Sequence, residues 1–171
     1  MTTDHDKPTT QARSVVPGTA NTKTGPLSAG LAYRQLGWPV VLRGDNVSLN
    51  LDLDVDAVAL VLPATLGMEV TDVLVRRRCP PAVLAHPALP AHLIIVAGER
   101  FPVPLAWPPG VHRVTGTLLL PPTVTAYGPV QWVRPPQPHA LKLCREVDVC
   151  AALRTAISDP SLTPPEAPTS Q

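Results

Sequence analysis

The sequence predicts an α+β domain, in which flanking helices cover a mainly antiparallel mixed sheet. Short segments rich in Val, Leu and Ile recur between prolines, a pattern typical of strands separated by turns. Other segments carry apolar residues at helical spacing instead. The chain has 171 residues, of which 44% are hydrophobic, so it can bury the core of one domain.

The first expected elements are a helix and a hairpin. Residues 26–36 are predicted to be helical, because Leu27 and Leu31 lie one turn apart and a glycine follows as a stop signal. Residues 39–51 are predicted to form a hairpin, because apolar residues alternate after a turn at residues 44–46.

The next two elements are expected to form the centre of the core. The continuous apolar run AVALVLP, residues 57–63, predicts a central strand that is buried on both faces. Residues 64–78 are predicted to be a helix that ends in three arginines, where the helix dipole favours cations. The apolar stripe of this helix is expected to contain Leu66, Val70, Val73 and Leu74.

The second half of the chain predicts several short strands and a closing helix. The strands are expected at residues 82–86, 92–97, 101–105, 112–120 and 130–133. Residues 138–157 are predicted to be one helix, with a buried stripe of Leu143, Val147, Cys150, Leu153 and Ile157.

The two ends of the chain differ in composition from the part between them. Residues 1–26 and 159–171 are polar, contain prolines and show no periodicity, so we expect flexible tails around a single domain at 27–158. The N-terminus lacks the apolar core of a signal peptide, and no apolar run is long enough to span a bilayer. We therefore expect a cytoplasmic protein that does not bind membranes.

Charge and motif content exclude several functional classes. The net charge is +1 and only 16% of residues are charged, so a strongly basic surface is excluded and only a local basic patch is compatible with the sequence. Three cysteines at irregular spacing indicate reduced thiols, and without a C-x-x-C pair they do not predict a zinc site. The sequence contains no P-loop, nucleophile elbow or H-E-x-x-H motif.

Three aspartates alternate just before the apolar run, at Asp52, Asp54 and Asp56. In an extended strand their carboxylates project from one face, about 6.5–7 Å apart. Such a row can belong to a site for a divalent cation, or it can be a solvated strand edge that opposes mispairing. The spacing favours the solvated edge, because two rigid carboxylates need to approach one Mg²⁺ to about 2.1 Å.

Two stretches resemble a known family. LAYRQLGWPVVL runs from the first helix into a strand, and GVHRVTGTLLLPPTVTAYGPVQWV joins two strands through a double proline. Together they resemble the N-terminal domain of bifunctional DNA primase/polymerases, the Prim-Pol branch of the archaeo-eukaryotic primase superfamily. The resemblance covers about residues 29–133. The second stretch fits the family pattern at Gly116, Pro121, Pro122, Thr123, Gly128 and Trp132.

The resemblance implies a primase/polymerase-like fold and names the residues that activity would need. Active members hold Mg²⁺ or Mn²⁺ with a D-x-D motif and a third carboxylate, and a histidine contacts the phosphates of the incoming nucleotide. The candidates here, if the chain is active, are Asp52, Asp54 and Asp56 with His92; Asp54 and Asp56 are the candidate metal ligands.

The catalytic set implied by the resemblance is incomplete. The third carboxylate is expected within residues 110–112, which read Gly-Val-His. In a second alignment, which we prefer, the D-x-D motif corresponds to the start of VLPATLG, residues 61–67, and both metal aspartates are missing. Pro90 precedes His92 where the family has flexible glycines, and it removes a backbone donor.

Three functional hypotheses follow. The preferred one is a catalytically degenerate Prim-Pol-like domain that serves DNA replication as an accessory module and needs no cofactor. It would bind nucleotides or nucleic acid weakly, through Arg76, Arg77 and Arg78. The alternative is an active primase/polymerase with Mg²⁺ or Mn²⁺. The third is a protein-interaction domain that retains only the fold, with a partner that the sequence does not identify.

Overall fold

The computed structural model describes residues 25–51, 57–99 and 105–158. The predicted tails and most of the predicted strand at 101–105 lie outside these residues. The elements in chain order are α1 (Pro26–Gln35), β1 (Val40–Arg43), β2 (Asn46–Leu51), β3 (Ala57–Pro63), α2 (Ala64–Arg76), β4 (Ala82–Ala85), β5 (Ala91–Ala97), β6 (His112–Val114), β7 (Gly116–Leu120), β8 (Val124–Thr125), β9 (Gly128–Pro129), β10 (Gln131–Arg134), α3 (Ala140–Leu143) and α4 (Glu146–Ser158).

The described strands form antiparallel sheets, which confirms the α+β fold class. The largest sheet has the order β10-β4-β5-β3-β6, and a second sheet has the order β1-β2-β7. The run 57–63 forms β3 as predicted, and it is an interior strand, although β5 takes the middle position. β8 and β9 form a small separate hairpin, which the sequence reading did not predict.

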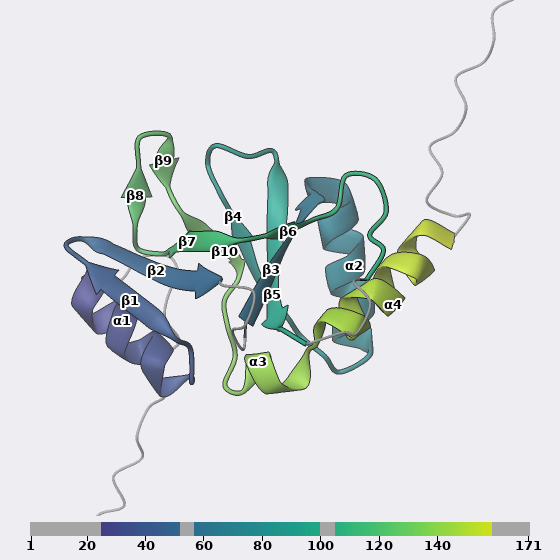
Figure 1. Ribbon diagram of the computed structural model, residues 1–171, viewed down its shortest axis with the longest axis horizontal. Coiled ribbons are helices and arrows are strands. Elements are labelled where there is room, and N and C mark those ends of the chain that lie inside the picture. The colour runs from purple at the N-terminus through teal and green to yellow at the C-terminus, as the bar shows by residue number, and fades with distance from the viewer. Residues whose placement is uncertain (1–24, 52–56, 100–104, 159–171) are drawn as a thin grey trace, which may run out of the picture.

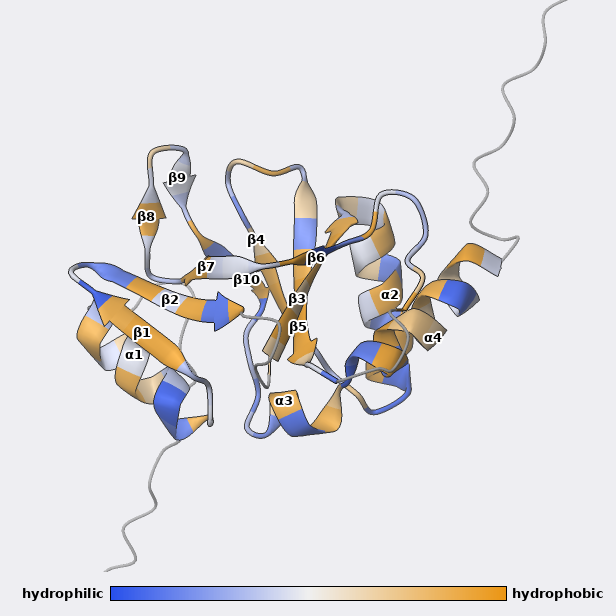
Figure 2. Ribbon diagram, in the orientation of Figure 1, coloured by the Kyte–Doolittle hydropathy of each residue, from blue (hydrophilic) through white to orange (hydrophobic). Residues whose placement is uncertain are grey.

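The five-stranded sheet separates two apolar cores, because side chains alternate between its faces. One face of β3 carries Val58, Leu60 and Leu62, which pack with α2 and α4. The other face carries Ala57 and Ala59, which pack with the three-stranded sheet and α1. Figure 1 shows α2 and α4 together on one side of the large sheet, while α1 lies beside β1 and β2 at the other end of the molecule. The interior strands are mostly apolar in Figure 2, as expected of a sheet covered on both faces, and β5 has a polar segment near one end.

The predicted helix at 138–157 is wrong as a single element. The chain forms α3 and α4 instead, and Cys144 between them is extended, with φ −121° and ψ 123°. The Cys144 carbonyl accepts a hydrogen bond of 2.9 Å from the amide of Ala97 at the end of β5. The Asp148 carboxylate then accepts a bond from the Arg145 amide and satisfies a free donor at the start of α4. Tertiary pairing with β5 therefore overrides helical propensity here.

The buried faces of α1 and α4 are set by close packing, and that of α4 differs in part from the predicted stripe. In α1, Leu27 is 66% exposed and Leu31 is 52% exposed, while Ala29, Gly30 and Tyr33 are buried. A β-carbon at Gly30 would come within 2.6 Å of Leu42, so the small residues let α1 approach β1 closely. In the stripe predicted for residues 138–157, Cys150 and Leu153 are buried as expected, but Leu143 of α3 and Ile157 of α4 are exposed. α4 also buries Val149, Ala152 and Ala156. The stripe predicted for α2 is confirmed.

The predicted strand at 112–120 is two strands in different sheets. β6 pairs with β3, and β7 pairs with β2. Gly116 lies at the change of direction with φ +85°, a conformation that side chains other than glycine rarely adopt. The hairpin of β1 and β2 is confirmed, with a turn of Gly44 and Asp45 and with Asn46 already paired to Arg43.

Tyr33 joins the two stretches that carry the family resemblance. Its hydroxyl donates a 2.8 Å hydrogen bond to the Pro121 carbonyl and accepts one of 2.8 Å from Nε1 of Trp132. Trp38 stacks on Tyr33 and meets Trp132 edge-on. Burial raises the pKa of Tyr33 to about 12, so the hydroxyl remains a donor at neutral pH. These aromatic residues are therefore core residues, and their role is structural.

Candidate functional site

The three aspartates of the predicted metal site, Asp52, Asp54 and Asp56, lie outside the described residues. The strands on either side limit how they could act with His92. Asp56 is bonded to Ala57, which pairs with Ala97 at one end of β3 and β5, whereas His92 pairs with Leu62, five positions further along β3. At about 3.4 Å per residue, Ala57 and Leu62 lie about 17 Å apart along β3, and His92 lies opposite Leu62. The strand register therefore does not favour one metal site that combines these aspartates with His92.

His92 lies beneath the first turns of α2. A β-carbon at Gly67 would come within 2.8 Å of the His92 β-carbon, so the glycine is what allows α2 to lie directly on this histidine. The Nδ1 atom of His92 is buried and has no hydrogen-bond partner among the described residues. His92 is thus a partly buried packing residue under a helix. Gly67 itself is the fourth residue of α2, which begins at Ala64.

The segment where the third carboxylate was sought contributes no acidic side chain. Gly110 forms a turn with φ +83°, Val111 is buried in the core and His112 is exposed at the start of β6. Across the described parts of the chain, no three His, Cys, Asp or Glu side chains converge in a way that could hold a metal ion. The residues described here do not fit the two-metal site of an active Prim-Pol domain.

A charged cluster that the sequence reading missed surrounds the start of α4. Glu146 is only 2% exposed and lies 3.7 Å from the Arg113 guanidinium, while Arg145 reaches Glu99 and Asp148 at 3.4 Å each. Burial raises the pKa of the Glu146 carboxyl, and the positive charge of Arg113 opposes this shift. The cluster fixes α4 against the ends of β5 and β6. No spacing in the sequence identifies it, because its members come from three separate segments.

The cysteines do not form a nucleophilic site. All three are free and buried, which confirms the expectation of unpaired thiols. The Cys79 thiol donates a hydrogen bond to the Leu143 carbonyl, and burial raises the pKa of both Cys79 and Cys144. A raised pKa leaves little thiolate at neutral pH, so neither thiol is activated for attack.

The three predicted phosphate-binding arginines lie at the C-terminal end of α2. Arg76 is the last helical residue, Arg77 caps the helix, and Arg78 follows in the left-handed conformation with φ +59°. All three side chains are exposed. The Arg77 guanidinium donates a 2.9 Å hydrogen bond to the Thr155 hydroxyl of α4. Within residues 25–51, 57–99 and 105–158 none of the three forms an ion pair, so their positive charges are not neutralised by a described carboxylate.

Exposed apolar side chains give little support to a protein-interaction surface. The exposed side chains of large hydrophobic residues are spread over several helices, strands and loops, which is ordinary for a protein surface. Two pairs of these exposed residues are close in sequence: Leu27 with Leu31 on α1, and Val124 with Tyr127 in the β8–β9 hairpin. In addition, the described residues contain no helix long and apolar enough to cross a membrane.

Comparisons with protein-family models, with curated proteins and with solved structures each gave no match to this chain. The resemblance to Prim-Pol domains therefore rests on the two sequence stretches alone. In the structure these stretches meet through Tyr33, Trp38 and Trp132. Thr123 of the second stretch also exchanges hydrogen bonds with the backbone of Val47.

Proposed function

We propose that this chain is an accessory module of DNA replication, related to Prim-Pol domains but without catalysis, that binds the phosphates of nucleic acid. The observation that carries the proposal is the set of three consecutive exposed arginines at the end of α2, which have no carboxylate partner among the described residues. Guanidinium groups match phosphate oxygens in a bidentate manner, and three of them side by side in sequence can contact neighbouring phosphates of one strand.

The low overall charge determines how strong this binding should be. The chain has a net charge of only +1, so contacts beyond these arginines add little attraction for a phosphate backbone. The stacking contribution is small as well, because Trp38 and Trp132 pack in the core with Tyr33. Binding should therefore be weak and should fall as salt is raised.

Three observations support the part of the proposal that the chain is not catalytic. Asp56 is bonded to the end of β3 that lies about 17 Å from His92. His92 packs under α2 against Gly67. The segment Gly110–His112 contributes no carboxylate. A two-metal mechanism needs carboxylates from neighbouring strands to converge on one place, which this register does not favour.

An oligonucleotide titration tests the binding. We expect a fluorescent single-stranded oligothymidylate to bind with an affinity that falls with salt, at a log–log slope of about −2 for three phosphate contacts at about −0.7 each. The triple variant Arg76→Gln, Arg77→Gln, Arg78→Gln should lose most of this slope. Fluorescence anisotropy between about 50 and 200 mM salt measures both the affinity and the slope.

Two control variants separate charge from structure in this titration. Arg43→Gln removes one exposed arginine from β1, which lies far from the end of α2 (Figure 1), and should leave the slope unchanged. Thr155→Val removes the hydrogen-bond partner of Arg77 but keeps the arginine, and it should also bind normally. An unchanged slope in the triple variant, or equal losses in the triple variant and Arg43→Gln, would contradict the proposal.

A further inference from the structure

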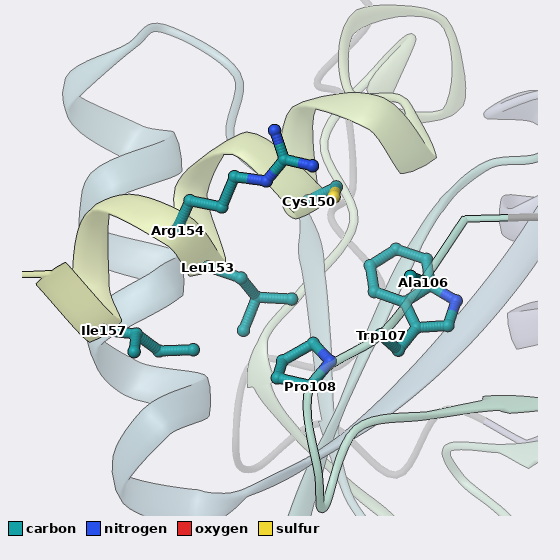
Figure 3. A pocket seen from close by; sticks show the side chains of 7 residues that line it. All are labelled: Ala106, Trp107, Pro108, Cys150, Leu153, Arg154 and Ile157. Carbon is teal, nitrogen blue, oxygen red and sulfur yellow. The ribbon is translucent and has the colours of Figure 1, made fainter.

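A groove lies between α4 and the segment that precedes β6. Its volume is about 270 Å³. It is lined by Ala106, Trp107, Pro108, Cys150, Leu153, Arg154 and Ile157. In Figure 3 Leu153 and Ile157 project from α4 towards Pro108 and Trp107, which form the opposite wall. Neither the arginines of α2 nor His92 line this groove, so it is separate from the site described above.

The chemistry of the lining is asymmetric. The indole of Trp107, the ring of Pro108 and the side chains of Leu153 and Ile157 offer apolar surface. Arg154 is the one charged residue among the lining residues, and Figure 3 shows its guanidinium group extending along α4 towards Cys150. Within the described parts of the chain Arg154 makes no hydrogen bond or ion pair. Apolar walls with one unpaired cation at the rim are complementary to an apolar molecule that carries one negative charge.

We propose that this groove binds a small monocarboxylate with an apolar tail. The carboxylate would accept two hydrogen bonds from the Arg154 guanidinium, and the tail would lie between Leu153, Ile157 and Trp107. The groove is smaller than the pockets of about 300–1,000 Å³ that hold drug-sized ligands. Its volume lies just below the lower end of that range, which suits a small ligand such as octanoate. A nucleotide suits it poorly, because its phosphates need several cations and the lining offers one.

Octanoate and its uncharged analogue octanamide test the two parts of the proposal separately. We expect octanoate to bind the full-length chain at one site and to change the fluorescence of Trp107, with Trp107→Phe abolishing the change. Octanamide should bind about tenfold more weakly, because a hydrogen bond to a charged group is stronger than a neutral one. Equal binding of the two compounds, or no saturable binding of octanoate, would overturn the proposal.

Variants on α4 show which contacts bind the ligand. Arg154→Gln should weaken octanoate about tenfold and leave octanamide unchanged. Ile157→Ala, at an exposed position where folding is not at risk, should weaken both compounds about threefold or more through lost apolar contact. An Arg154→Gln variant that binds octanoate normally but loses oligothymidylate would assign Arg154 to the nucleic-acid surface instead and would overturn the proposal.

The proposal does not depend on nucleic-acid binding, and one control keeps the two apart. The triple variant of Arg76, Arg77 and Arg78 should bind octanoate as the unmodified chain does. Removal of residues 159–171, which follow α4 and carry the carboxylates of Asp159 and Glu166, should leave octanoate affinity unchanged as well. A rise in octanoate affinity of about tenfold or more would overturn the proposal, because it would show that the chain's own C-terminal segment occupies the groove.

Discussion

Replacement of Ile94 by aspartate is expected to abolish the folded state at neutral pH. Ile94 lies in β5, the middle strand, and none of its surface is exposed to solvent. It pairs with Leu60 on β3 and Val83 on β4, and it faces the core formed with α2 and α4. An unpaired charge here costs several kcal/mol, a large share of the roughly 5–15 kcal/mol that stabilises a domain. Leu60 would be a less decisive position, because Arg113 is its partner on β6 and could pair with an introduced carboxylate.

Circular dichroism during thermal unfolding measures the effect of the Ile94 substitution. The matched control is Val133→Asp, which introduces the same charge on β10 at a side chain that is 50% exposed. It should change the free energy of unfolding by less than about 0.5 kcal/mol. A cooperative transition for Ile94→Asp close to that of the unmodified protein would show that β5 is not at the centre of the core.

Tyr33→Phe is expected to destabilise the protein by about 2 kcal/mol, because it leaves two polar groups without their partner. The Pro121 carbonyl loses its donor and Trp132 Nε1 loses its acceptor, while the ring itself stays in place. Both groups belong to segments about 90–100 residues from Tyr33 in sequence, so the hydroxyl joins distant parts of the fold.

Urea denaturation of Tyr33→Phe measures this loss, with Tyr127→Phe as the matched control. Tyr127 lies between β8 and β9 and is 75% exposed, so removal of its hydroxyl should have an effect below about 0.5 kcal/mol. Equal effects of the two substitutions would contradict the hydrogen-bond arrangement around Tyr33.

The elements that the sequence predicted well are those whose signals are local. The apolar run 57–63, the stripe of α2 and the hairpin of β1 and β2 are confirmed because periodicity and turn residues determine them directly. The errors arise where distant contacts decide. Cys144 is extended because its carbonyl accepts the Ala97 amide. Distant contacts also decide which face of α1 is buried: Ala29 and Gly30 face the core, and a β-carbon at Gly30 would come within 2.6 Å of Leu42 of β1.

The candidate site was predictable only in part. The exposed positions of Arg76, Arg77 and Arg78 follow from a helix end that the sequence indicates. The position of His92 under α2 depends on how closely Gly67 allows the helix to approach, which no pattern in the sequence reveals. The buried Glu146 and the groove beside Trp107 were missed for the same reason, since each forms between segments far apart in the chain.

Primer extension tests the central claim most directly. The reaction should contain Mn²⁺ or Mg²⁺, all four deoxynucleotides, a primed template, and protein at a concentration that saturates oligothymidylate in the anisotropy titration. We predict that the chain binds this template through Arg76, Arg77 and Arg78 and incorporates no nucleotide. Template-directed extension that is lost in Asp54→Asn or Asp56→Asn, with the variants still folded, would contradict the account and would identify an active polymerase.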